Sequence, residues 1–157
     1  PPRPRFRQEE YDSDGHGFWT PNRPIFFDDR GPGPDRTIPP DRTQAVATDN
    51  AVNQNDLVPF VGLADRNGKI LRRIEMPYYC NHYHSNPDNT ILVGDDVDDL
   101  VLIDISGEKA TQETLCYHGT SWHMQSSHCH PTWSWDGTRI LYASDKGGRV
   151  NVYMVKP

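Results

Sequence analysis

The segment HCHPTWSWDGTRILYASD (residues 128–145) carries the pattern that decides the fold. It runs from histidine through small and aromatic residues to a Trp-Asp-Gly turn, and then through an apolar run that ends in aspartate. Two earlier segments keep the same order, GHGFWTPNRPIFFDD (15–29) and NHYHSNPDNTILVGDD (81–96). Asn, Asp and Gly tolerate the left-handed backbone of a tight hairpin, so each segment is predicted to form two antiparallel strands.

Two plainer hairpins are predicted between the histidine-headed ones. The first is PFVGLADRNGKILRRIEMP (59–77), with a turn at 65–68, and the second is LVLIDISGEKATQETLCYH (100–118), with a turn at 106–108. Two successive hairpins make a four-stranded sheet, and sheets repeated along a chain are typical of a β-propeller. A single β-sandwich would show similar strand spacing. The recurrence of the same features in the same order favours an all-β chain of propeller blades.

The chain is predicted to form one partial propeller domain over residues 1–157. It holds two pairs of hairpins and then the hairpin 128–145 with the strand VNVYMV (150–155), which makes between two and three blades. Propellers close with at least about four blades, because closure protects the strand edges. We therefore expect the C-terminal part of a longer protein. The Pro-, Asn- and Asp-rich stretch at 29–57 is predicted to be a surface insertion, with a lid over a pocket as the alternative.

Composition argues against several classes of protein. Of the 157 residues, 34% are hydrophobic and 26 are proline or glycine, which favours short strands and turns over long helices. The net charge of −6 and the lack of a dense Lys/Arg run argue against a nucleic-acid partner. No apolar run approaches the roughly 18 residues of a membrane span. The oligomeric state is not indicated.

The cysteines bear on the cellular compartment. Cys80, Cys116 and Cys129 are odd in number and form no CxxC pair, so neither a disulfide framework nor a thiolate zinc site is predicted. A reducing, cytoplasmic location fits this pattern, with a periplasmic or secreted location as the alternative.

Six of the seven histidines lie between positions 82 and 130. On a strand, His128 and His130 would project to one face. Gln125 lies just upstream and offers an amide oxygen, and His82 or His84, at the head of the preceding blade, offers a third imidazole. Three imidazole nitrogens and an amide oxygen suit a divalent Mn, Fe, Co, Ni or Zn ion with open coordination positions. The sequence therefore predicts a metal site.

The other histidines receive separate interpretations. His16 heads the first blade, and a neutral imidazole beside a metal that polarises the substrate is a natural general base near neutral pH. The alternatives for His16 are a fourth metal ligand or a structural partner of a backbone group. His118 and His123 are predicted to be hydrogen-bonded polar residues.

Taken together, these motifs resemble the C-terminal part of the oligogalacturonate lyases. The resemblance covers nearly the whole chain outside the insertion, in the order GHGFW (15–19), HYHSNPDNTILVGD (82–95), HGTSW (118–122), QSSHCHP (125–131) and SDKGGRVNVYMV (144–155). It implies a seven-bladed propeller that binds a divalent metal, typically manganese. It also implies cleavage of short pectin-derived oligogalacturonides, which are acidic oligosaccharides, by β-elimination to unsaturated uronate.

The resemblance also assigns roles to residues. The implied base is His16, which would remove the C5 proton, and the implied metal ligands are His82, Gln125, His128 and His130. The family position of His84 is a non-ligand, and the candidates for substrate binding are Trp122 and His84.

The chain departs from the family pattern close to these residues. Gly17 stands where the family usually has Glu, and Cys129 stands where it has Pro, so the walls of the pocket differ. The family's substrate-binding arginine lies upstream of the GHGFW motif and has no position in this chain, as we expect for the C-terminal part of a longer protein. The alternatives are a non-catalytic TolB- or WD-like propeller that binds a protein or sugar, and a metalloenzyme that acts on a related uronide.

Overall fold

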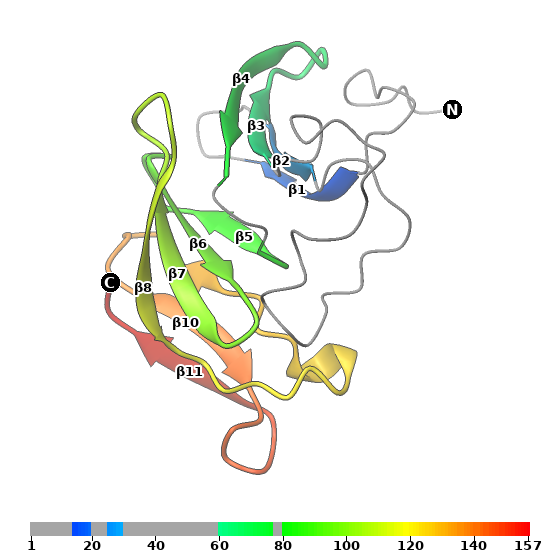
Figure 1. Cartoon of the computed structure of the whole chain (residues 1–157), viewed down its shortest axis with the longest axis vertical. Coiled ribbons are helices and arrows are strands. Elements are labelled where there is room, and N and C mark those ends of the chain that lie inside the picture. Colours follow the sequence, from blue (N-terminus) through cyan, green and yellow to red (C-terminus); the bar gives the residue numbers. More distant parts are fainter. Residues whose placement is uncertain (1–13, 20–24, 30–59, 77–79) are drawn as a thin grey trace, which may run out of the picture. The chain divides into compact units, whose positions relative to one another are not determined.

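The computed structural model describes residues 14–19, 25–29, 60–76 and 80–157, and this part of the chain folds into three antiparallel sheets (Figure 1). The predicted all-β class is confirmed. The described residues contain one 3-10 helix, η3 (Gln125–Ser127), and no helix among them is long and apolar enough to cross a membrane. The strands are β1 (Asp14–Trp19), β2 (Ile25–Asp29), β3 (Phe60–Ala64), β4 (Ile70–Glu75), β5 (Tyr83–Ser85), β6 (Ile91–Asp95), β7 (Asp99–Asp104), β8 (Thr111–Tyr117), β9 (Thr132–Trp133), β10 (Ile140–Ser144) and β11 (Asn151–Val155).

The first sheet has the order β1-β2-β3-β4 and lies in one compact unit of the chain. Its second hairpin turns where the sequence predicts. The side chain of Asp65 accepts the N–H groups of Asn67 at 2.8 Å and Lys69 at 3.0 Å, and Gly68 has a φ of 85°. The predicted insertion joins the neighbouring strands β2 and β3, and its residues 30–57 lie outside the described residues.

The second unit contains the other two sheets, with the orders β5-β6-β7-β8 and β11-β10-β9. The hairpins predicted at 81–96, 100–118 and 128–145 are therefore all present, and β11 matches the predicted strand at 150–155. The Trp-Asp-Gly turn between β9 and β10 is closed by Asp136, whose side chain accepts hydrogen bonds from Ser134 and Thr138. These bonds hold the pKa of Asp136 down at about 2.

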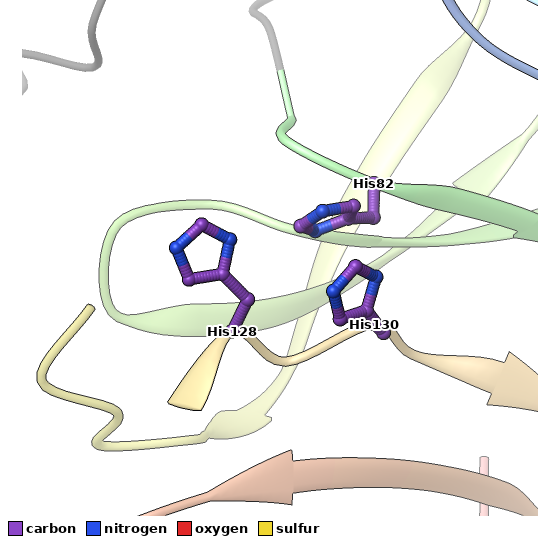
Figure 2. Close-up of side chains that lie close together, drawn as sticks. All are labelled: His82, His128 and His130. Atoms are coloured by element: carbon purple, nitrogen blue, oxygen red, sulfur yellow. The ribbon is translucent and has the colours of Figure 1, made fainter. Parts of the chain in front are cut away.

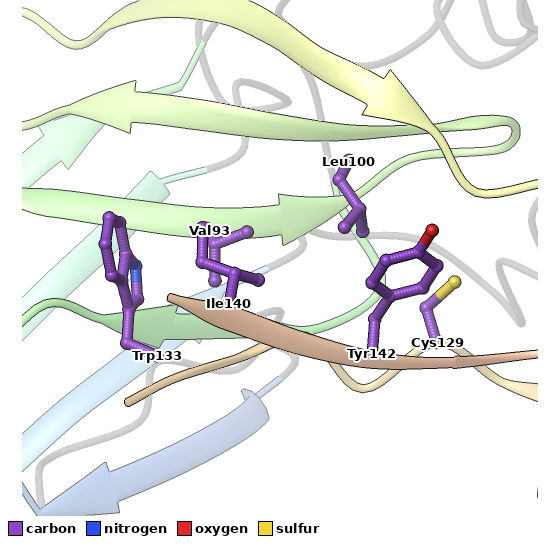
Figure 3. Close-up of a cluster of buried hydrophobic side chains, with 6 residues drawn as sticks. All are labelled: Val93, Leu100, Cys129, Trp133, Ile140 and Tyr142. Atoms are coloured by element: carbon purple, nitrogen blue, oxygen red, sulfur yellow. The ribbon is translucent and has the colours of Figure 1, made fainter. Parts of the chain in front are cut away.

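An apolar cluster joins the two sheets of the second unit (Figure 3). Because side chains alternate across a strand, Val93 of β6 and Leu100 of β7 point to the same face of their sheet. They pack there against Cys129, Trp133, Ile140 and Tyr142. The three cysteines are free thiols, and burial raises the pKa of Cys129 far above its ordinary value, as expected of an inert core thiol.

Gly94 marks a place where two segments of the second unit approach closely. A Cβ atom at this position would meet Sγ of Cys80 at 2.7 Å and Cβ of Cys80 at 2.9 Å. Both residues are buried, so the contact has no room to relax toward solvent. A residue larger than glycine at this position therefore requires a shift of Cys80, which lies two residues before His82.

We predict that Gly94→Ala lowers the free energy of unfolding of the full-length protein by about 1 to 3 kcal/mol through overpacking. Urea denaturation measures the loss. Gly107→Ala is the matched control, because its nearest atom would be the carbonyl oxygen of Lys109 at 3.6 Å. The control should change stability by no more than about 0.5 kcal/mol. Equal losses in the two variants would contradict the close approach.

Candidate metal centre

Three imidazole rings gather in the second unit, from two segments far apart in the sequence (Figure 2). His82 lies just before β5, while His128 and His130 lie between η3 and β9. The ring centroid of His82 is 3.9 Å from that of His130 and 5.8 Å from that of His128. One ring nitrogen of each residue falls within 4.8 Å of the others. The structure thus brings together three of the four residues named as ligands.

The backbone around His128 and His130 differs from the predicted strand. β9 begins only at Thr132, and His130 has a φ of 44° in the left-handed region. His128 and His130 still gather with His82, while Cys129 between them is fully buried in the apolar cluster. The strand prediction was wrong for these residues, although the separation of the histidines from the cysteine was right. A left-handed histidine is uncommon, and such strained residues concentrate at functional sites.

Asp95 holds His82 in place. Its Oδ1 accepts the backbone N–H of His82 at 2.6 Å, and its Oδ2 lies 2.8 Å from Nδ1 of the His82 ring. Burial raises the pKa of Asp95 well above its ordinary value, while the bond from the His82 N–H and the neighbouring His118 and His128 oppose that rise. Asp95 was not named from the sequence, although the apolar run closed by aspartate was the signal that pointed to it.

His118 anchors the loop that leads to the three rings. It is fully buried, its Nδ1 accepts the N–H of Thr120 at 3.0 Å, and its Nε2 donates to the carbonyl of Asp96 at 3.1 Å. The hydroxyl of Thr120 donates in turn to the carbonyl of Ser127, the residue before His128. Ser144 of β10 donates to the carbonyl of His118 at 2.8 Å. This network supports the segment that carries His128, and it gives His118 the predicted structural role.

Trp122 supports the same segment from another side. Its φ is 59°, its indole N–H donates to the carbonyl of Val97 at 2.9 Å, and its ring stands edge-on to His128 at 5.1 Å. The preceding residue, Ser121, donates its hydroxyl and its backbone N–H to Asp145, and these bonds lower the pKa of that carboxyl. Trp122 is therefore held beside the imidazole cluster with part of its surface accessible.

His84 takes a different role from His82. Its Nδ1 accepts the backbone N–H of Trp133 at 3.2 Å, which links β5 of one sheet to β9 of the other. Burial lowers the pKa of His84 and favours the neutral ring that this bond requires. The group of described residues that could hold a metal ion contains His82, the residue that the family motif names, and does not contain His84.

The other residues singled out from the sequence do not belong to the three-histidine group. Gln125 lies exposed on η3, and its backbone carbonyl accepts the N–H of His128 at 3.3 Å. His123 is exposed. His16 lies on β1, in the other unit of the chain, and its side chain is outside the described residues.

The fold and the imidazole cluster define a class of protein: an all-β chain of propeller blades with a three-histidine candidate metal centre. No family model matches the chain. Two curated bacterial proteins match part of it. It is 30% identical over 105 residues to an oligogalacturonide lyase of Pectobacterium atrosepticum, and the match covers 54% of this chain and 27% of the relative. It is 32% identical over 102 residues to an oligogalacturonate lyase of Dickeya dadantii, with coverage of 52% and 26%.

A solved structure matches almost the whole chain. The crystal structure of an oligogalacturonate lyase from Vibrio parahaemolyticus superposes with a TM-score of 0.70 at 20% identity, and the match covers 98% of this chain and 38% of that protein. This likeness shows the propeller fold. The chain spans about a quarter of the length of the curated relatives it matches. The resemblance to oligogalacturonate lyases predicted from the motifs is confirmed by these similarities.

We predict that His118→Ala destabilises the full-length protein by about 2 to 4 kcal/mol, because it leaves the Thr120 N–H and the Asp96 carbonyl without their buried partner. Thermal or urea denaturation measures the loss. His123→Ala, an exposed histidine of the same loop, is the control and should cost no more than about 0.5 kcal/mol. A loss of stability in His118→Ala as small as that in the control would argue against the anchoring network.

Proposed function

We propose that this chain is part of a metal-dependent lyase that cleaves short oligogalacturonides by β-elimination. The observation that carries the proposal is the convergence of His82, His128 and His130 in a chain similar to oligogalacturonate lyases. These histidines come from the motifs HYHSNPDNTILVGD and QSSHCHP, through which the chain resembles that family. The same proposal makes the protein a carbon–oxygen lyase in pectin degradation. Its substrates would be the acidic oligosaccharides released from pectin.

The imidazole cluster fits a divalent metal ion. Nitrogen ligands at about 2.1 Å from one ion lie roughly 3 to 4 Å apart, and the three ring nitrogens are within 4.8 Å of one another before any adjustment. Imidazole is a common ligand of borderline transition metals. The proposed ligands are His82, His128 and His130 with Gln125 as the fourth, and the proposed ion is Mn²⁺, with Fe, Co, Ni or Zn as alternatives.

The chemistry divides between the ion and the protein. A bound divalent cation would attract the uronate carboxylate and stabilise the negative charge that develops when the C5 proton leaves. His16 is proposed as the base that accepts that proton. The electron pair of the broken C5–H bond forms the C4–C5 double bond. The C4–O4 bond breaks, and the leaving sugar departs with its electron pair and takes up a proton from water at O4. A cationic centre also accounts for the attraction of an anionic sugar by a chain whose net charge is −6.

We predict that His82→Asn abolishes stoichiometric binding of a divalent metal by the full-length protein, while His84→Asn retains it. The two histidines share one face of the same segment, but His84 bonds to Trp133 and lies outside the imidazole cluster. Metal analysis after gel filtration gives the stoichiometry. Loss in both variants or in neither would contradict the ligand assignment. A wild-type protein without bound metal after incubation with Mn²⁺ would favour the non-catalytic propeller.

We predict that the wild-type protein with Mn²⁺ raises the ultraviolet absorbance of a digalacturonate solution, because β-elimination creates a conjugated double bond. His16→Ala should retain the metal and lose at least about 100-fold of the rate, which is the usual contribution of a general base. Loss of metal together with activity would instead make His16 a ligand. Metal binding without any absorbance change in the wild-type protein would point to a metalloenzyme with another substrate.

A further inference from the structure

We infer that Asp95 is the positioning residue that makes His82, rather than its neighbour His84, a metal ligand. The inference rests on the proposed function for the identity of the ligand, but its evidence is the hydrogen bonding of the protein itself. Asp95 closes β6, directly opposite the residue that precedes β5. Asp95 is not one of the proposed ligands, but its side chain contacts the ring of one of them, His82.

The carboxylate of Asp95 contacts His82 through both of its oxygens. One oxygen accepts the backbone N–H of His82, which a purely structural aspartate would also do. The second oxygen lies 2.8 Å from the ring Nδ1. In the proposed arrangement this oxygen accepts a hydrogen bond from Nδ1, so Nδ1 carries the ring proton and Nε2 keeps its lone pair for a metal. The ring nitrogen that remains for binding is thereby chosen by Asp95.

The surroundings keep this pair from rearranging. Asp95 is fully buried and His82 nearly so, which strengthens the bond and excludes competing water. The backbones of the two residues are also joined, since the Asp95 N–H reaches the His82 carbonyl at 3.4 Å and the Asn81 N–H donates to the Asp95 carbonyl at 2.9 Å. Gly94, in tight contact with Cys80, fixes the strand just before Asp95.

His84 provides the contrast within the same segment. Side chains alternate, so His82 and His84 point to the same face of the sheet, toward β9 to β11. The Nδ1 of His84 accepts a backbone N–H from Trp133, so the ring proton of His84 lies on Nε2. His118 has the same arrangement, with Nδ1 accepting from Thr120. The group opposite Nδ1, a carboxylate or a backbone N–H, therefore separates the proposed ligand from the two structural histidines.

The decisive variant is Asp95→Asn in the full-length protein. The asparagine oxygen can still accept the His82 N–H, but its amide donates to Nδ1 and moves the ring proton to Nε2. We expect the affinity for Mn²⁺ to fall about 10- to 100-fold, as for other partners of metal-bound histidines. We also expect nitrogen-15 NMR of the metal-free, histidine-labelled protein to show His82 changing from the Nδ1–H to the Nε2–H form.

Asp96→Asn is the matched control. Asp96 is the next residue, is also buried, and uses one side-chain oxygen to accept the N–H groups of Asp98 and Asp99, which an asparagine oxygen can replace. This variant makes the same change of charge and should leave both the Mn²⁺ affinity and the His82 tautomer unchanged. Thermal melting of both variants separates a local effect from a loss of fold.

The outcomes distinguish this inference from the proposed function. Unchanged Mn²⁺ affinity and tautomer in a folded Asp95→Asn protein would overturn the positioning role. A wild-type His82 in the Nε2–H form would overturn it as well, even if the variant fails to fold. A wild-type protein with His82 in the Nδ1–H form that binds no Mn²⁺ would instead overturn the proposed metal centre.

Discussion

The apolar contact between the β5 to β8 sheet and the β9 to β11 sheet determines the geometry of the candidate site. Val93 and Leu100 on one sheet face Ile140 and Tyr142 on the other, and full burial of each large apolar side chain is worth about 1.5 to 3 kcal/mol. A net hydrogen bond adds about 1 kcal/mol, or about 1.5 to 3 kcal/mol where one partner is charged, and the bonds at the imidazole cluster act between groups that the apolar contact already brings close. The core therefore brings the two chain segments together, and the polar network then sets the details.

Polar contacts refine what the core brings together. Cys129 belongs to the apolar cluster, whereas its neighbours His128 and His130 lie in the imidazole cluster with His82. A tertiary hydrogen bond to Asp95 then positions the His82 ring, and the loop held by His118 supports the segment that carries His128. One side of the site is therefore formed by His82 beside the β5 to β8 sheet, and the other by the loop that carries His128. This division suits a centre in which ligands come from neighbouring blades.

The sequence predicts the hairpins well because turn chemistry is local. The Asp65 to Gly68 turn needs only an aspartate that can accept neighbouring N–H groups and a glycine that can adopt a positive φ. The backbone at His130 could not be predicted this way, because the local sequence has no glycine or turn motif that marks its left-handed φ of 44°. The grouping of His82 with the later histidines followed from the repeat. The residues alone could not separate His82 from His84, since the deciding partners lie 13 and 49 residues away.

The aspartate that closes each apolar run has different uses in the different sheets. In the first sheet Phe27 pairs with Gly17, and in the second Gly94 pairs with Tyr83, so Asp28 and Asp95 occupy the corresponding next positions. Both are almost completely buried, which is rare for a carboxylate and requires a compensating interaction. In the third sheet Asp145 instead fastens the loop at Ser121. The recurring aspartate in the sequence therefore marks an equivalent position in the first and second sheets. The group that lies opposite each aspartate determines its role.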